Sequence, residues 1–195
     1  MSTKKKNLGI LAYVLIAVVA LGIGYAAISA VTLTISGRAS ATANQNNFVV
    51  VFNDAANKTS ITSNPASIAT YNDGTEVTTA SVDATDKTVA SFSLYGFTNK
   101  NQYADVTYTV INNSPDLKAK LCENSITVTG GSASTFTSTA SLPSATGDPK
   151  CVILNANGGE TTIVVRTTLN VTPTTQNVSA NDLQVRFQAE PIANN

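Results

Sequence analysis

The hydrophobic pattern divides the chain into one uninterrupted apolar run near the N-terminus and a long region in which apolar and polar residues alternate. The run at 8–28 contains no charged side chain over 21 residues. As a helix it would be about 30 Å long, which matches the hydrocarbon core of a membrane. The alternation that follows has a period of two, which is typical of half-buried β-strands. The pattern therefore predicts a hydrophobic helix followed by an all-β region.

Residues 1–26 have the features of an export signal. Three lysines at 4–6 precede the apolar run, and such residues stay on the cytoplasmic side of a membrane. Small side chains at Gly24 and Ala26 suit the −3 and −1 positions of a signal-peptidase site. We therefore expect a signal peptide that is cut between Ala26 and Ala27, so that only this segment contacts a membrane. A retained hydrophobic helix is the alternative.

Beyond the leader, the alternating runs predict a single β-sandwich domain over 44–195. Turn-forming Gly, Asn, Asp and Pro separate these runs, and about seven to nine short strands with such turns suit jelly-roll or Ig-like connections. The continuous apolar run Phe48–Phe52 favours a central strand that is buried on both faces. The Ser/Thr-rich segment 131–150 is expected to be an exposed loop or a weak edge hairpin. The alternating runs are 31–36, 90–94, 104–110, 163–169 and 183–188.

Composition and charge exclude several classes of function. Charged residues make up 12% of the chain, against about 25% in ordinary soluble domains. The absence of His excludes His-based acid–base catalysis, Ser-His-Asp and Cys-His triads and His-ligated zinc. Because 12 basic residues balance 12 acidic ones, nothing favours a nucleic-acid partner. We therefore expect no enzyme activity, no catalytic, cofactor-binding or metal-binding residues, and no cofactor.

Two features of the β-region point to an extracellular protein. Cys122 and Cys151 form an even pair, which in an exported chain favours a disulfide. Closing a loop of about 30 residues in this way would contribute about 3–4 kcal/mol in the chain-entropy model. Four candidate glycosylation acceptors match the pattern Asn-x-Ser/Thr, although a chain so rich in these residues also produces chance matches. These acceptors are Asn57, Asn112, Asn170 and Asn177.

The leader junction resembles the TasA/camelysin-type proteins. The resemblance rests on the sequence Leu-Gly-Ile-Gly-Tyr-Ala-Ala-Ile-Ser at 21–29, on Leu-Thr-Ile-Ser-Gly at 33–37, and on the strand ending in Asn-Asn at 104–113. The family implies export by Gram-positive bacteria through a SipW-like signal peptidase, a jelly-roll-like sandwich, and assembly into matrix fibres at the cell surface. Some members are described as metalloproteases, but this chain has no His and no His-Glu-x-x-His motif, so that activity is not carried over.

The fibres of that family suggest a mechanism that also follows from strand chemistry. A sandwich that lacks one strand can accept a neighbour's strand, which adds main-chain hydrogen bonds and alternating side-chain anchors. The candidate donor is 27–43, in which Gly37 and the small residues after it would act as a joint. Its inward anchors would be Val31, Leu33 and Ile35. Alternatively, this segment is the first strand of its own sandwich.

The sequence thus favours an exported, extracellular structural protein that forms a head-to-tail homopolymer in a fibre or biofilm matrix. Two other functions stay open. One is a pilin-like filament subunit that keeps its helix after cleavage behind Lys6, with Asn7 as its N-terminus. The other is a membrane-anchored adhesion module that does not assemble. The mature N-terminus distinguishes these hypotheses.

Overall fold

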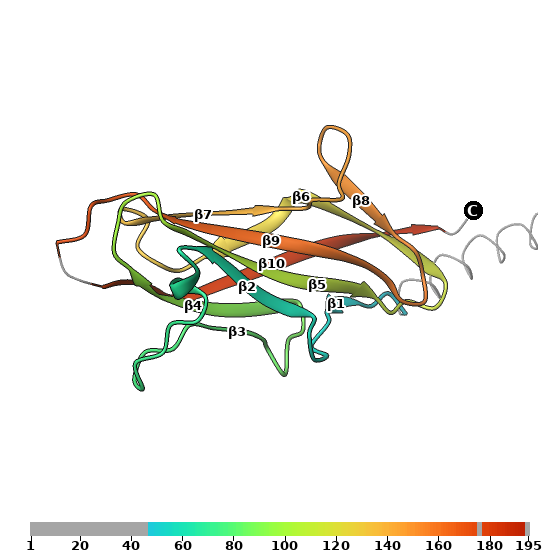
Figure 1. The fold of residues 1–195 in the computed structure, drawn as a ribbon. Helices are drawn as coiled ribbons and strands as arrows, with labels where there is room; N and C mark the ends of the chain where they lie inside the picture. The colour runs from blue at the N-terminus through green and yellow to red at the C-terminus, as the bar shows by residue number, and fades with distance from the viewer. Residues whose placement is uncertain (1–46, 175–176, 194–195) are drawn as a thin grey trace, which may run out of the picture. The chain divides into compact units, whose positions relative to one another are not determined.

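The computed structural model describes residues 47–174 and 177–193, and these form an all-β structure of two antiparallel sheets (Figure 1). The chain separates into two compact units, Met1–Asn46 and Asn47–Asn195, and every described strand belongs to the second. The prediction of an all-β sandwich is confirmed at this level. The predicted signal peptide, its cleavage site at Ala26 and Ala27, and the candidate donor 27–43 lie outside the described residues.

Sheet one is built around two long central strands, with shorter strands on either side. Its order is β1-β5-β9-β7, and β2 also pairs with β5. The strands are β1 (Val50–Phe52), β2 (Thr59–Asn64), β5 (Tyr103–Asn112), β7 (Phe136–Ser141) and β9 (Gly159–Leu169).

Sheet two is built around the last and longest strand of the chain. Its order is β3-β4-β10-β6-β8, so β10 lies between β4 and β6. A short 3-10 helix, η1 (Ala66–Ile68), lies in the connection between β2 and β3. The strands are β3 (Thr79–Val82), β4 (Val89–Phe97), β6 (Leu117–Thr129), β8 (Cys151–Leu154) and β10 (Val178–Ala193).

The core lies between the two sheets, as the alternation in the sequence requires. Every second residue of β5 is fully buried while its neighbours are only partly covered, because successive side chains point to opposite faces. The same alternation directs the apolar residues of β4, β9 and β10 into the core. Tyr108 of β5 also connects the sheets, because its hydroxyl donates a hydrogen bond to the Ser91 carbonyl oxygen of β4 at 2.9 Å.

Two predictions about individual segments need correction. Phe48–Phe52 is not a central strand, because β1 contains only Val50–Phe52 and lies at the edge of sheet one. Its side chains alternate in burial, and Val49 is 43% exposed. The segment 131–150, expected to be an exposed loop or a weak edge hairpin, does contain an edge strand, β7, but this strand pairs with β9 and not with a neighbour inside the segment. A continuous apolar run therefore does not by itself distinguish a central strand from an edge strand.

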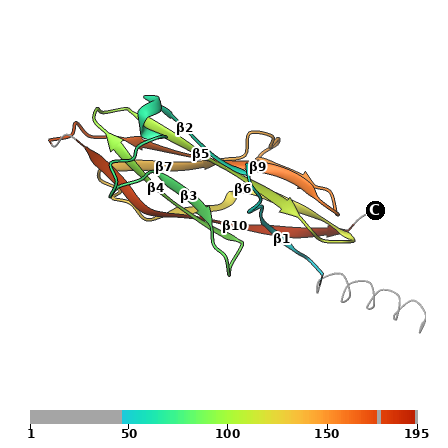
Figure 2. The same cartoon turned by 60° about the horizontal axis from the view of Figure 1, so that its bottom comes forward.

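We call the two ends of the sandwich, along the direction of the strands, the near end and the far end (Figure 2). At the near end β5 stops at Asn112, β6 starts at Leu117, and the described chain begins just before β1. The Asn112 side chain donates a hydrogen bond to the Leu117 carbonyl at 2.9 Å, which places both residues at this end. At the far end β4 stops at Phe97, and β10 starts at its partner Val178.

Candidate functional site

The edges of the long strands differ in how completely other strands border them. On one side β5 pairs with β9 over its whole length, from Tyr103 to Asn112. On the other side two short strands lie in line, β1 opposite the last residues of β5 and β2 opposite the rest. Between them, Asn53 donates to the Thr109 carbonyl at 2.8 Å, and Thr109 donates to the Lys58 carbonyl at 2.9 Å. Both edges of β5 are thus occupied without a break.

In contrast, β10 is bordered along only part of each edge, because β6 pairs with it from Gln184 onward and β4 pairs with it only as far as Arg186. Its pairing with β6 runs to Ala193, but its pairing with β4 stops at Arg186 opposite Val89. From Phe187 onward, no strand within residues 47–174 or 177–193 pairs with this side of β10. We call Phe187–Ile192 on this side the near half-edge of β10.

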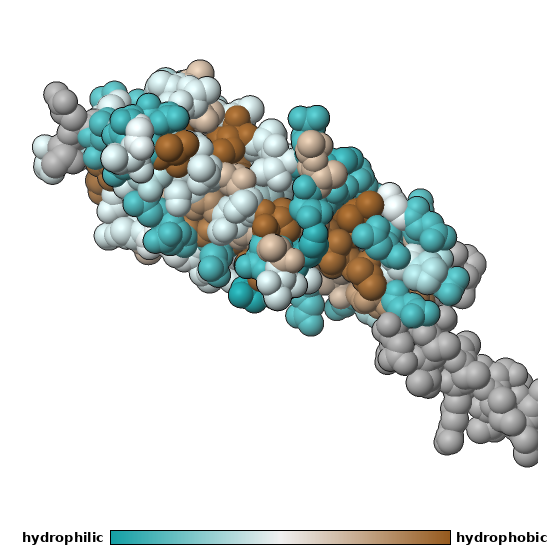
Figure 3. Space-filling model, turned by 90° about the horizontal axis from the view of Figure 1, so that it is seen from below, coloured by the Kyte–Doolittle hydropathy of each residue, from teal (hydrophilic) through white to brown (hydrophobic). Residues whose placement is uncertain are grey.

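A groove lies beside the near half-edge, between β10 and the start of sheet one. Its volume is about 340 Å³, and no charged side chain lines it. Phe187 is 8% exposed, whereas Ala189 and Phe48 are only partly buried although both pack against the core. Figure 3, which views the molecule from the side of β1 and β3, shows apolar side chains reaching the surface of this face. The lining residues are Phe48, Val50, Thr88, Phe187, Gln188 and Ala189.

A second incomplete edge belongs to β6. Its pairing with β8 covers Ala119–Cys122, after which the Glu123 N–H donates to the Lys150 carbonyl at 2.9 Å. Among the described strands, none pairs with this side of β6 beyond that point. We call 124–129 on this side the far half-edge of β6. Its ladder with β10 is irregular, because the register shifts between Phe187 and Ala189.

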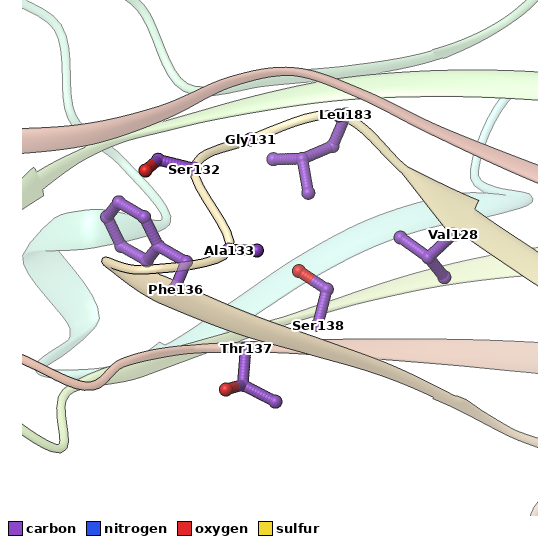
Figure 4. Close-up of a pocket in the computed structure, with 9 residues that line it drawn as sticks. Val128, Gly131, Ser132, Ala133, Phe136, Thr137, Ser138 and Leu183 are labelled. Carbon is purple, nitrogen blue, oxygen red and sulfur yellow. The ribbon is translucent and has the colours of Figure 1, made fainter.

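The far half-edge of β6 borders a hollow of about 280 Å³ at the far end of the sandwich. Figure 4 shows Val128 of β6, Ser138 of β7 and Leu183 of β10 around the same space, with the loop that follows Gly131 along one side. Several lining residues carry hydroxyl groups, namely Ser132, Thr137 and Ser138. This hollow is therefore more polar than the groove beside β10.

A third incomplete edge, on β9, is covered by a loop. β7 borders β9 only from Val164 to Leu169. Over the remainder, the Ser144 hydroxyl lies 2.8 Å from the Thr161 hydroxyl, and Leu142 is 2% exposed. The loop after β7 thus protects this part of sheet one, in the way that folded proteins often cover an edge.

The near end of the sandwich is held together by covalent and polar contacts. The predicted disulfide between Cys122 and Cys151 is present and joins β6 to β8. The fully buried Asn112 amide donates to the carbonyl oxygens of Leu117, Leu154 and Asn155 at 2.9, 3.3 and 3.1 Å. It therefore ties the end of β5 to the start of β6 and to the end of β8, which lie at the same end of their ladder.

The four candidate glycosylation acceptors differ in accessibility. Asn112 is fully buried with its amide nitrogen in hydrogen bonds, so its side chain is not accessible to a glycan in this fold. Asn57 and Asn177 are exposed, and Asn170 is partly buried with its amide 2.6 Å from the Thr137 hydroxyl. Asn57, Asn170 and Asn177 stay predictions.

The charged side chains form pairs at the surface rather than a reactive cluster. Hydrogen bonding to Lys58 and Asn53 holds the pKa of Glu160 below its usual value, and Lys87 does the same for Asp54. These pairs lie where β1 and β2 meet along β5. Within residues 47–174 and 177–193, no group of three His, Cys, Asp or Glu side chains is arranged to hold a metal ion. In the same part of the chain, no helix is long and apolar enough to cross a membrane.

Sequence reasoning missed both half-edges. The alternation at 183–188 predicts a strand, but a period of two cannot reveal which neighbours pair with that strand or where their pairing stops. The length of β10 is the one signal that could have indicated a half-edge. β10 has 16 residues and β4 has nine, so β4 cannot border the whole of β10.

No protein-family model matches the chain, and no curated protein matches it. Among solved structures, one similar chain is the enzymatically active domain of the bacteriophage CBA120 tailspike protein 4, with 10% identity and a TM-score of 0.27. The match covers 71% of this chain and 20% of the tailspike chain, so the chain spans about a fifth of that protein's length.

A second similar structure is TmCBM61 in complex with β-1,4-galactotriose, with 9% identity and a TM-score of 0.21. The match covers 75% of this chain and 88% of that one. At these TM-scores neither likeness carries an argument about function.

Proposed function

We propose that the chain is an exported structural protein without enzyme activity, a subunit of an extracellular fibre or biofilm matrix. Each subunit donates its N-terminal strand, from the segment 27–43, to the sandwich of the next subunit. The resemblance of the leader junction to the TasA/camelysin-type proteins, whose members form matrix fibres, supports this proposal. So does the apolar alternation of Val31, Leu33 and Ile35, which is the pattern that a donated strand needs.

The observation that carries the proposal is the difference between the bordered edge of β5 and the half-edges in sheet two. On β5, two short strands in line complete one edge of a longer strand. Sheet two has the same kind of place, because β4 and β8 each border only part of a longer neighbour. One more short strand in line with either of them would complete the sheet and add main-chain hydrogen bonds. A strand from a second copy has the required length and alternation.

Donation from copy to copy also accounts for a filament. Each contact joins the N-terminal segment of one subunit to the body of another, so the contact is heterologous and head-to-tail. A chain of such contacts stays open and grows as a fibre. The hydrophobic leader would prevent donation inside the cell, and a signal peptidase would release the donor strand during export. Under this proposal the sandwich has jelly-roll-like connections, as the resemblance implies.

The mature N-terminus and the assembly state test this function together. N-terminal sequencing of protein extracted from the cell surface is expected to begin at Ala27, and electron microscopy of the same sample is expected to show filaments. A sequence that begins at Asn7 would indicate the pilin-like alternative. An intact leader, with a monomer that needs detergent for extraction, would indicate the membrane-anchored module. Protein that begins at Ala27 but stays monomeric at every concentration would contradict the fibre function.

A further inference from the structure

We propose that the acceptor for the donated strand is the near half-edge of β10 with the groove beside it, and that the far half-edge of β6 is not used. This inference rests on the proposed function and names the surface on which it operates. It commits to one occupant, which is the segment Val31–Ser36 of a second copy of this chain.

The two half-edges differ in which strand carries the irregularity of their shared ladder. The near half-edge of β10 runs from Phe187 to Ile192, and from Ala189 onward its pairing with β6 is continuous. A strand of six residues is about 20 Å long, so Val31–Ser36 matches this edge. On β6, the register shift leaves only Ile126–Thr129 in regular pairing with β10. At the shift one residue of β10 faces residues 122–125 of β6, so the extra residues and the bend that they cause belong to β6.

The chemistry of the two cavities points the same way. The groove beside β10 is lined by Phe, Val and Ala with one Thr and one Gln, whereas hydroxyl groups and glycines form much of the hollow beside β6. The segment 27–36 carries no charge, and its three anchors are aliphatic. Burial of aliphatic surface contributes about 25 cal/mol per Å². The anchors therefore gain more in the groove beside β10.

The groove also has room over one particular residue. Ala189 is small, partly buried and packed against the core, and it lies two residues after the buried Phe187 on the same face of β10. The same groove is lined by Val50 of β1 and by Phe48, which precedes β1. A larger aliphatic side chain placed over Ala189 would contact both sheets. We assign this position to one of the three anchors.

The place where the described chain begins supports the same acceptor. Phe48 lines the groove itself, so the described part of the chain begins beside the near half-edge. The 11 residues at 36–46 span at most about 40 Å when fully extended. This reach lets the donor cross to the groove of an adjacent copy whose near end is close by. Arg186 pairs with Asp86 at 3.7 Å just before the half-edge, and Glu190 within it pairs with Lys120 at 3.9 Å, but no charged side chain lines the groove.

Disulfide trapping in filaments of the exported full chain tests the acceptor. In one series, Ala189→Cys is combined in turn with Val31→Cys, Leu33→Cys or Ile35→Cys. In the matched series, Val128→Cys on β6 replaces Ala189→Cys. Thr34→Cys with Ala189→Cys is the control, because a strand directs Thr34 to the face opposite its neighbours. Electrophoresis without reductant measures covalent ladders, and thermal melting of each variant shows that it is folded.

The expected result is a ladder of linked subunits with Ala189→Cys and at least one anchor, at least about tenfold stronger than with Thr34→Cys. Ladders with Val128→Cys instead would overturn the acceptor while leaving the fibre function intact. A link formed only within single chains would show that each sandwich uses its own strand and would overturn both. Filaments without a link in either series would also overturn the acceptor. Absence of filaments from the unsubstituted chain would reject the fibre function, and the acceptor with it.

Discussion

β5 and β10 are both long, amphipathic strands, yet other strands border β5 along both edges, whereas they border β10 along only part of each edge. The inward residues of β5 from Ala104 to Val110 are all 0% exposed, whereas Ala189 of β10 stays partly open beside the groove. The same alternation thus produces a closed core in one sheet and an accessible edge in the other. The burial of an alternating strand depends on its neighbours as much as on its own sequence.

A matched pair of Ala→Lys substitutions is the strongest test of this difference between β5 and β10. In Ala104→Lys, a charge enters the closed core of β5, and we expect a loss of about 4–5 kcal/mol or more in the free energy of unfolding. In Ala189→Lys, the side chain can extend from the open groove into water, so we expect a loss of about 1 kcal/mol or less. Urea denaturation measures both.

The same pair separates folding from assembly. Ala189→Lys is expected to stay folded but to sediment as a monomer, because the ammonium group occupies the proposed acceptor. Equal destabilisation by the two substitutions would show that the edge of β10 is as closed as that of β5. Normal filaments of Ala189→Lys would place the acceptor elsewhere.

A smaller effect is expected at the end of β5, where Asn112 connects the sheets. Asn112→Ala removes the donor for three carbonyl oxygens, and we expect a loss of about 2–3 kcal/mol in the free energy of unfolding. The control is Asn113→Ala, because Asn113 is exposed and uses its backbone rather than its side chain to bond Val49. Thermal or urea unfolding compares the two. A similar loss in both would mean that the turn, rather than the buried amide, is responsible.

The smallest effect concerns pH and the pairs at the junction of β1 and β2. The pKa of Glu160 in the folded protein lies below its usual 4.5, because Lys58 and Asn53 bond the charged form. A lowered pKa means that its stabilisation is present above about pH 4.5 and is lost as the pH falls through the folded value. We expect acidification from pH 6 to below 4 to lower Tm by up to about 2 °C through this exposed pair.

The control for the pH experiment is Glu160→Gln, which removes the titrating group and should lose that part of the Tm decrease. Between pH 6 and 8 the Tm of each protein should not change with pH, because the chain has no His that titrates in this range, and Glu160→Gln should melt slightly lower because it lacks the charged carboxylate that bonds Lys58. A Tm decrease of the same size in Glu160→Gln would assign the acid sensitivity to other carboxylates, of which Asp54 beside Lys87 is one.

Individual strands could be predicted from the sequence, whereas their order in the sheets could not. The alternating runs at 90–94, 104–110, 163–169 and 183–188 are β4, β5, β9 and β10, because period-two burial is a local property. The disulfide was predicted from an even cysteine count together with the expectation of export, and the structure contains it. The position of Phe48–Phe52 did not follow, because its apolar character reflects the groove and the core beside a short edge strand.

The candidate acceptor could not be predicted because it is defined by where pairing stops. Nothing at Arg186 or Phe187 marks the point at which β4 ends its pairing, since that point depends on the start of β4 at Val89. The burial of Asn112 could not be predicted from the sequence for a similar reason. An Asn-x-Ser pattern is local, whereas the three carbonyl groups that bind its amide come from β6, β8 and the turn after β8.

The ionisation of Tyr108 is an intrinsic spectroscopic probe of whether the two sheets stay packed together. The chain has no Trp, and Tyr108 is fully buried with its hydroxyl bonded across to β4. Burial raises its pKa, so its phenolate absorbance does not develop while the two sheets stay together. In an alkaline titration, the phenolate absorbance of Tyr108 should therefore appear only when the two sheets separate. In a filament, the same band would follow the integrity of each subunit without any added dye.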